Sequence, residues 1–251
     1  MSTSDFLQRI NQLNEMIGKS KHIVFFGGAG VSTESGIPDF RSKDGLYNQH
    51  DVQFDSYAPE YLLSHECVYR NSKVFFEYYR QKMDTRNIKP NITHYKLAEM
   101  EQKGKLDCVV TQNIDGLHQK AGSKTVYEIH GTTQRNYCTK CGRQVPADFI
   151  FESTDPIPLC PDCGGMIRPD VTMYGESLPD YAWDGAMRSI SKADMFIIGG
   201  TSLTVYPAAN LTHYFRGENL VMINRDITPQ DRYCKLVFHE NLGDVFGAIK
   251  I

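Results

Sequence analysis

Short apolar runs that each stop at a glycine-rich or polar cluster constrain this fold more than any other feature. The first run, Ile23–Phe26, leads directly into Gly27-Gly28-Ala29-Gly30. Comparable runs follow at Leu106–Thr111, Met195–Ile198, Leu220–Ile223 and Leu236–Phe238, with a shorter β-like stretch at Val126–Ile129. Because apolar and polar residues hardly alternate within these runs, they indicate strands that are buried on both faces. Such strands are typical of parallel sheets, so the chain is predicted to have an α/β fold.

Helical patterns separate these runs. Apolar residues recur at helical spacing after Ser4, and Gly18 follows the last of them. Further helices are predicted at Thr93–Gln102, Asp184–Ile190 and Ala208–Arg216. The last of these opens after a proline and closes at a glycine, which is the usual asymmetry of helix ends. Strands alternating with helices predict a sheet covered on both faces, with ligands beyond the carboxyl ends of its strands.

Two stretches interrupt this alternation. Residues 43–92 are rich in aromatic residues and are predicted to be helical, whereas residues 135–168 contain few long apolar runs. We expect both stretches to form a smaller module over the edge of the sheet. The large domain would then consist of residues 1–42, 93–134 and 169–251, and the small domain of residues 43–92 and 135–168.

Four of the seven cysteines form two Cys-x-x-Cys pairs 18 residues apart, namely Cys138, Cys141, Cys160 and Cys163. Structural Zn²⁺ takes four such ligands in a tetrahedron, and the glycine after each pair permits a tight turn. A segment so poor in apolar residues needs a metal to hold its fold. The alternative, two redox motifs, is disfavoured because redox chemistry needs no matched second pair. Four thiolates leave no open position, so the predicted zinc ion is structural.

Composition excludes several classes of protein. Charged residues make up 23% of the 251 residues, which argues against disorder. The longest apolar runs span four residues, far fewer than the ~20 of a membrane helix, and no signal peptide pattern follows Met1. We therefore expect a cytoplasmic protein with no membrane partner. A net charge of −3, with balanced charges in residues 135–168, gives no reason to expect direct nucleic acid binding.

The cluster after the first strand suits phosphate binding. The stretch Gly28–Thr33 is a candidate dinucleotide loop, although it lacks the third glycine and the later acidic residue of the usual fingerprint. Arg41 follows closely, and a planar guanidinium matches phosphate oxygens. Its neighbour Phe40 is suited to shield a reacting centre from water. An ordinary strand-to-helix turn, followed by a surface loop with a packed phenylalanine and a solvated arginine, is the simpler alternative.

Polar side chains also follow two other strands. Gln112-Asn113-Ile114-Asp115 comes directly after the strand at Leu106–Thr111, and His130 closes the stretch at Val126–Ile129. Because the ends of parallel strands meet at one edge of a sheet, a histidine there is a candidate general base. A structural histidine is the alternative, and these residues alone leave both open.

Taken together, these residues resemble the sirtuins, the Sir2-like NAD-dependent protein lysine deacylases, in a compact bacterial-type form. Besides the four cysteines, the motifs that carry the resemblance are Gly28–Ser32, Ser35–Ser42, Thr111–His118, His130-Gly131, Arg168-Pro169-Asp170, Tyr174–Glu176, Gly200–Leu203, Val205-Tyr206-Pro207 and Asn224. The resemblance covers nearly the whole chain. It implies a Rossmann-like parallel sheet with helices on both faces, plus a smaller zinc-binding and helical module. NAD and an acetyl-lysine-bearing protein or peptide would meet between the two.

The resemblance also implies roles for single residues, all given by their numbers in this chain. The diphosphate and adjoining ribose of NAD are expected to contact Gly28, Ala29, Thr33 and Arg41, with Phe40 over the reacting sugar. The nicotinamide side is expected to consist of Gln112, Ile114 and Asp115, ordered by Asn113, and the adenosine side of Thr201, Ser202 and Asn224. The acyl-lysine is expected to contact Tyr174, Gly175, Glu176 and Val205. His130 is expected to be the catalytic base, assisted by Asn113.

The implied reaction transfers an acetyl group from lysine to ADP-ribose and releases nicotinamide and 2′-O-acetyl-ADP-ribose. A mono-ADP-ribosyltransferase and a non-catalytic NAD or ADP-ribose sensor are the alternatives for the same cleft, and the chain is expected to be a monomer. Two positions depart from many sirtuins. Tyr174 stands where a second phenylalanine is common, and Phe76–Arg80 lacks the Tyr-x-x-Arg spacing of relatives that remove succinyl groups. We therefore expect acetyl and short neutral acyl groups to be preferred.

Overall fold

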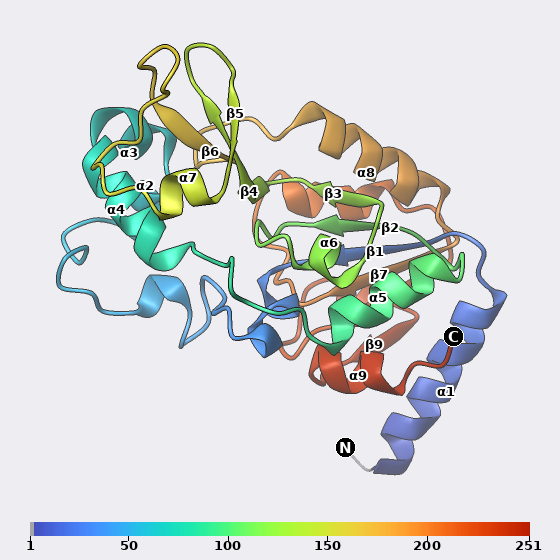
Figure 1. Cartoon of the computed structure of the whole chain (residues 1–251). Coiled ribbons are helices and arrows are strands. Elements are labelled where there is room, and N and C mark those ends of the chain that lie inside the picture. Colours follow the sequence, from blue (N-terminus) through green and yellow to red (C-terminus); the bar gives the residue numbers. More distant parts are fainter. Residues whose placement is uncertain (1–2) are drawn as a thin grey trace.

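A six-stranded parallel sheet runs through the centre of the computed structural model, which describes residues 3–251 (Figure 1). Its strands are β1 (Ile23–Gly27), β2 (Leu106–Thr111), β3 (Val126–Glu128), β7 (Met195–Gly199), β8 (Asn219–Ile223) and β9 (Leu236–Phe238). They lie in the order β3-β2-β1-β7-β8-β9, and every neighbouring pair is parallel. The predicted strands and the α/β class are confirmed. Residues 1 and 2, with which the expected large domain begins, lie outside the described residues.

Helices cover both faces of this sheet (Figure 1). One face carries α1 (Thr3–Lys19), α5 (Ile92–Gln102), α6 (Leu117–Ala121) and α9 (Leu242–Ala248). The other carries α8 (Asp180–Lys192) and a 3-10 helix at Ala208–Tyr214. Along β1, Phe25 packs toward the first group of helices and Phe26 toward the second, so the whole strand is buried. Burial on both faces is why the strand reads as an uninterrupted apolar run.

Two helices differ from their predicted form. α8 begins at Asp180 rather than at Asp184, with Pro179 at its N-cap, and its first turn includes Ala182, which is buried four residues before Ala186. The predicted helix at Ala208–Arg216 is a 3-10 helix that ends at Tyr214. Within it, the Thr212 hydroxyl donates a hydrogen bond of 2.9 Å to the carbonyl three residues back, which competes with α-helical bonding. No helix among residues 3–251 is both long and apolar enough to cross a membrane.

The aromatic-rich stretch at residues 43–92 is only partly helical. It contains a 3-10 turn at Leu46–Asn48 and the helices α2 (Pro59–Leu62), α3 (His65–Arg70) and α4 (Ser72–Lys82). The prediction of helix is wrong for residues 43–45, 49–58 and 83–91, which form turns and irregular backbone. In the second of these segments the Asp51 side chain accepts a hydrogen bond from the backbone of Gln53, a local pattern that competes with helix formation.

A second, antiparallel sheet carries the cysteine pairs. Its strands lie in the order β5 (Gln144–Pro146), β4 (Gly131–Cys138) and β6 (Ile167–Val171), and α7 (Asp148–Phe151) follows β5. This sheet shares one apolar core with the helices of residues 43–92, to which Phe75 and Tyr79 of α4 contribute. The two insertions, far apart in the sequence, therefore pack together as one unit beside the parallel sheet (Figure 1).

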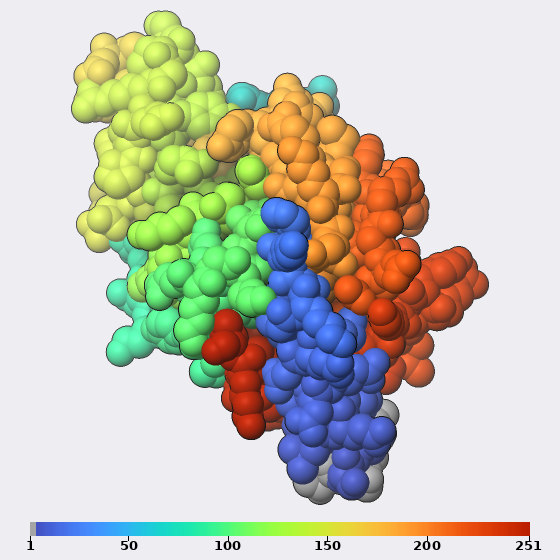
Figure 2. Space-filling view, turned by 90° about the vertical axis from the view of Figure 1, so that its right-hand side faces the viewer, coloured from blue at the N-terminus to red at the C-terminus, as the bar shows by residue number. Residues whose placement is uncertain are grey.

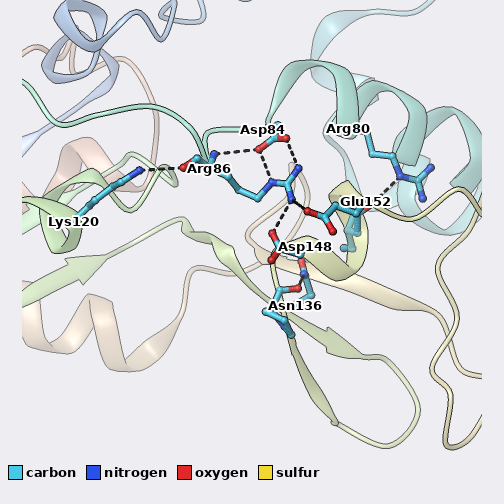
Figure 3. Close-up of polar contacts among 9 residues, drawn as sticks. Arg80, Asp84, Arg86, Lys120, Asn136, Asp148 and Glu152 are labelled. Atoms are coloured by element: carbon cyan, nitrogen blue, oxygen red, sulfur yellow. Dashed lines mark hydrogen bonds and ion pairs between the residues drawn. The ribbon is translucent and has the colours of Figure 1, made fainter.

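Arg86 joins this unit to the parallel-sheet part of the molecule (Figure 3). Its guanidinium donates to Asp84 at 2.8 Å, to Asp148 at 2.7 Å and to Glu152 at 2.9 Å, so it ties the segment after α4 to α7. From α6, the Lys120 ammonium donates to the Arg86 carbonyl at 3.0 Å. One residue is thus bonded through its side chain to the cysteine-bearing unit and through its backbone to a helix of the parallel sheet.

The beginning and end of the described chain also lie together. Figure 2 shows α1 in blue beside the C-terminal segment in dark red. The backbone N–H of Lys250 donates to the Asn14 side chain at 2.9 Å, and the Lys103 ammonium donates to the Ile251 carbonyl at 3.1 Å. These bonds close the helical layer on that face of the sheet.

Two buried histidines between α5 and α6 make the stability of this fold depend on pH. The ring centres of His94 and His118 lie 4.7 Å apart. Burial lowers the pKa of His94 to about 4 and lowers the pKa of His118 well below its ordinary value. Both are ordinary histidines when the chain unfolds, with a pKa of about 6.5. The unfolded chain therefore binds more protons below that pH, and the free energy of unfolding falls as pH drops from about 6.5 toward 4.

We predict that His118→Leu weakens this pH dependence. Neither ring nitrogen of His118 has a hydrogen-bond partner among the described residues, so an apolar replacement leaves no lost bond behind. Urea unfolding at pH 7.5 and pH 5 should show a smaller loss of stability in the variant, by up to ~1.4 kcal/mol per pH unit. Equal losses in variant and wild type would contradict the prediction.

Candidate active site

A cavity of about 600 Å³ opens at the carboxyl ends of β1, β2 and β7, between the parallel sheet and the unit that carries the cysteines. All the predicted non-metal site residues except Asp115 line it. From the parallel-sheet side these are Gly28, Ala29, Thr33, Phe40, Arg41, Gln112, Asn113, Ile114, His130, Thr201, Ser202, Val205 and Asn224. From the loop after β6 these are Tyr174, Gly175 and Glu176. The tertiary structure therefore brings the predicted clusters into one place.

The glycines of the first loop form the floor of this cavity. The backbone N–H of Gly30 donates to the carbonyl of Gly200 at 2.9 Å, so the loops after β1 and β7 touch. A Cβ atom on Gly30 would lie 2.7 Å from the Cα atom of Gly200, and one on Gly28 would lie 2.8 Å from the Cβ atom of Thr201. No larger residue fits at either place. The glycines thus allow the two loops to come into contact. Because they carry no side chains, they also leave the backbone accessible to a ligand.

His130 has the geometry of a general base. Its Nδ1 atom lies 3.0 Å from the backbone carbonyl of Gln112, which only accepts hydrogen bonds, so Nδ1 carries the proton and Nε2 is left with a free lone pair. Burial lowers the pKa of His130 below its ordinary value, and the bond to the Gln112 carbonyl offsets part of that change. At neutral pH the ring is therefore uncharged and able to accept a proton.

Asp115 lies behind the cavity wall instead of lining it. Its carboxylate accepts hydrogen bonds from the Ser32 hydroxyl at 2.7 Å and from the backbone N–H of Leu117 at 2.9 Å. Ser32 in turn accepts from the Asn113 side chain at 3.1 Å. Burial raises the pKa of Asp115, and the bonds from Leu117 and Ser32 offset part of the rise. Asp115 thus orients the wall residue Asn113 through Ser32, a residue to which the sequence motif alone assigned no role.

Glu176 is held by the protein on several sides. Its carboxylate accepts hydrogen bonds from Arg168 at 2.6 and 2.9 Å, from the backbone of Met173 at 2.9 Å, and lies 2.9 Å from Nδ1 of His65. Burial raises the pKa of Glu176, but the bonds from Arg168, Met173 and His65 reverse this effect and bring it down to about 2. Because its carboxylate oxygens are already hydrogen-bonded, Glu176 fixes the loop that carries Tyr174 and has little capacity to bind a ligand.

Part of the cavity wall was not predicted from the sequence. Tyr47, Leu63, Tyr79 and Met173 line an apolar side, and residues 225–229 line the side beyond β8. The first three come from the insertion at residues 43–92, where the sequence shows no register relative to the sheet. Only aromatic richness marked that stretch, and aromatic residues serve a core equally well.

The four cysteines come together as predicted. Their sulfur atoms all lie within 4.8 Å of one another, with Cys138 and Cys163 at 3.5 Å and Cys141 and Cys160 at 3.8 Å. Four sulfurs at about 2.3 Å from a tetrahedral Zn²⁺ are roughly 3.8 Å apart, so this arrangement fits the ion. Backbone N–H groups of the first knuckle point at the Cys138 sulfur at 3.4 and 3.5 Å, as thiolate ligands require.

A family model described as the Sir2 family matches residues 28–207, which include the glycine loop, His130 and all four cysteines. The chain belongs to the Sir2 family. This confirms the resemblance found in the sequence, and the sheet described above is the Rossmann-like sheet that the resemblance implied.

Curated relatives and solved structures are similar to this chain along nearly its whole length. An NAD-dependent protein deacetylase of Clostridium perfringens is 52% identical over 243 residues, covering 96% of this chain and 98% of the relative. One from Clostridium acetobutylicum is 49% identical over 243 residues, covering 97% and 98%. A Sir2 complex with a p53 peptide and NAD⁺ superimposes with a TM-score of 0.82 at 35% identity, covering 98% and 96% of the two chains. A Sir2 protein bound to a propionylated peptide gives 0.83 at 33% identity, covering 95% of each.

We predict that Cys163→Ser releases zinc from the protein. The ion loses one of four ligands, and the antiparallel sheet loses the staple that compensates for its small core. Elemental analysis should give one zinc per wild-type chain and well under one in the variant, with a lower unfolding temperature. Cys234→Ser, outside the cluster, is the matched control and should keep the metal. Folded wild-type protein without zinc would contradict the prediction.

Proposed function

We propose that the protein is an NAD-dependent protein lysine deacetylase. It transfers the acetyl group of a lysine to ADP-ribose and releases nicotinamide and 2′-O-acetyl-ADP-ribose. The observation that carries the proposal is that His130, an uncharged base with a free ring nitrogen, lines the same cavity as the glycine loop and Tyr174. The Sir2 family membership and the deacetylase names of its relatives support this reading.

The parallel-sheet side of the cavity is proposed to bind NAD. The glycine loop after β1 allows the diphosphate to approach the backbone, and Arg41 supplies a cation for it. Gln112, whose amide donates to the Thr201 hydroxyl at 2.9 Å, links the nicotinamide side to the adenosine side. The adenosine side also includes Ser202 and Asn224. NAD supplies a ribose carbon that already carries a good leaving group, so the protein needs only to orient and deprotonate.

His130 and Asn113 are proposed as the catalytic residues. The acetyl oxygen would first displace nicotinamide from the ribose carbon. Nε2 of His130 would then take a proton from a ribose hydroxyl, so that this oxygen can attack the acetyl carbon and the lysine amine can leave. The Gln112 carbonyl holds the tautomer that makes this possible. Asn113 is oriented through Ser32 by the buried Asp115, which gives Asp115 an indirect role in the nicotinamide side.

The loop after β6 is proposed to bind the acetyl-lysine of a protein or peptide. Tyr174 offers an aromatic wall for the lysine stem, and Gly175 and Val205 also line the cavity. The carboxylate of Glu176 is engaged by Arg168, so Glu176 supports this loop instead of contacting the acyl group.

Product analysis tests the proposal directly. After incubation with NAD and an acetyl-lysine peptide, mass spectrometry should show the deacetylated peptide together with acetyl-ADP-ribose. A peptide that gains ADP-ribose would point to a transferase, and an unchanged peptide would point to a sensor. Either result would overturn the proposed function.

The cellular location, oligomeric state and partners of the enzyme are also proposals. We propose a cytoplasmic monomer whose partners are acetylated proteins and not nucleic acids, in keeping with the net charge of −3. Light scattering behind size exclusion should give a mass near 28.5 kDa. A dimer would contradict the monomeric part of the proposal.

His130→Ala is predicted to abolish turnover while keeping NAD bound. Removal of a general base costs 10²-fold or more in kcat, roughly, whereas the affinity for NAD should stay within about threefold. Because burial lowers the pKa of His130, the acid limb of kcat/KM in the wild type should lie below pH 6.5. His213→Ala, an exposed histidine outside the cavity, is the control. Near-normal kcat in His130→Ala would remove the residue from the mechanism.

Neutral acyl groups are predicted to be removed more efficiently than succinyl. Arg80 is occupied elsewhere, since its guanidinium donates to the carbonyls of Ile150 at 2.9 Å and Asp155 at 2.7 Å. Tyr79 lines the cavity, and Arg168, the cation that acts on Tyr79, is already paired with Glu176, so a buried carboxylate would lose its hydration uncompensated. The kcat/KM for acetyl- and propionyl-lysine should exceed that for succinyl-lysine at least tenfold, about 1.4 kcal/mol. Equal values on one peptide sequence would contradict this.

A further inference from the structure

The hydroxyl of Tyr174 connects the two sides of the cavity. Nη2 of Arg41 donates to it at 3.1 Å, and the Tyr47 hydroxyl lies 3.0 Å from it. The same guanidinium stands over the Tyr47 ring, 5.7 Å from its centre. Tyr174 belongs to the loop after β6, whereas Arg41 and Tyr47 belong to the loop after the first strand. A single phenol oxygen thus bridges the segment proposed to bind NAD and the segment proposed to bind acyl-lysine.

The segment at residues 39–48 folds back on itself to place these groups. The backbone N–H of Tyr47 donates to the Phe40 carbonyl at 3.0 Å, and the Phe40 and Tyr47 rings pack edge to face at 5.3 Å. Asp39 accepts from the backbone of Arg41 at 3.0 Å. The backbone of Arg41 is therefore fixed locally, and what remains free is its long, flexible side chain.

The bond to Tyr174 restricts that side chain. Arginine has five N–H donors, and among the described residues the Arg41 guanidinium uses one of them, on Tyr174. About four donors are left for a ligand in the cavity that Arg41 lines. A guanidinium already held in place loses less rotamer freedom when it binds a phosphate.

We propose that Tyr174 is a positioning residue for the diphosphate of NAD, acting through Arg41. The inference rests on the proposed function, because it assumes that Arg41 contacts that diphosphate. The aromatic ring of Tyr174 serves the acyl-lysine side and its hydroxyl serves the dinucleotide side. A phenylalanine at this position would keep the first role and lose the second.

Binding of ADP-ribose to Tyr174→Phe tests this role without requiring any turnover. Calorimetry should show a dissociation constant about threefold to tenfold higher than that of the wild type, the loss expected for one net hydrogen bond. In steady-state kinetics, KM for NAD should rise by a similar factor, and kcat should change by a smaller factor. Tyr181→Phe is the matched control, since Tyr181 is exposed on α8 away from the cavity, and its dissociation constant should stay at the wild-type value.

A double-mutant cycle separates positioning from a general structural effect. In an Arg41→Ala background, Tyr174→Phe should cause no further loss of ADP-ribose affinity, because its route of action is gone. The same loss in both backgrounds, or unchanged affinity in the single variant, would overturn the inference. If the variants change the dissociation constant for ADP-ribose by these factors while the wild type removes no acetyl group, the proposed function is wrong and the positioning role of Tyr174 stands.

Discussion

The close contact between the loops after β1 and β7 is the constraint on which the rest of the site depends. Gly30 and Gly200 touch through their backbones, with a bond of 2.9 Å and no space for a Cβ atom. This contact is possible only because β1 and β7 are neighbours in a parallel sheet, so that their carboxyl ends meet at one edge. The Thr201 hydroxyl then accepts a hydrogen bond from the amide of Gln112, which directly follows β2, so three strand ends form one surface.

A second constraint concerns the unit that covers this surface. Its antiparallel sheet has three strands and little apolar area of its own, so it relies on the four cysteines and on aromatic side chains of α4. Arg86 and Lys120 connect the unit to the parallel sheet. One side of the cavity therefore depends on contacts outside it, and we expect loss of the metal to affect a site that contains no metal ligand.

Within the site, hydrogen bonds to neighbouring protein groups decide what each side chain can do. His130 can act as a base because the Gln112 carbonyl accepts a hydrogen bond from Nδ1–H, which leaves the Nε2 lone pair free. Asn113 is oriented because its amide donates to Ser32, which in turn donates to the buried Asp115. Glu176 is a support because Arg168 occupies it. In each case the residue type allows several roles, and a neighbour from another element selects one of them.

The sequence by itself determined the sheet, the cluster of four cysteines and the polar clusters that line the cavity. Doubly buried strands must be continuous apolar runs, and paired Cys-x-x-Cys knuckles have few other uses, so both leave local patterns. Only the tertiary structure decided that residues 49–58 are not helical, that Asp115 lies behind the wall, and that Arg80 turns toward the carbonyls of Ile150 and Asp155. It also decided that Tyr174 holds Arg41. These features depend on contacts between segments far apart in the chain, and such contacts leave no periodicity in the sequence that could be read beforehand.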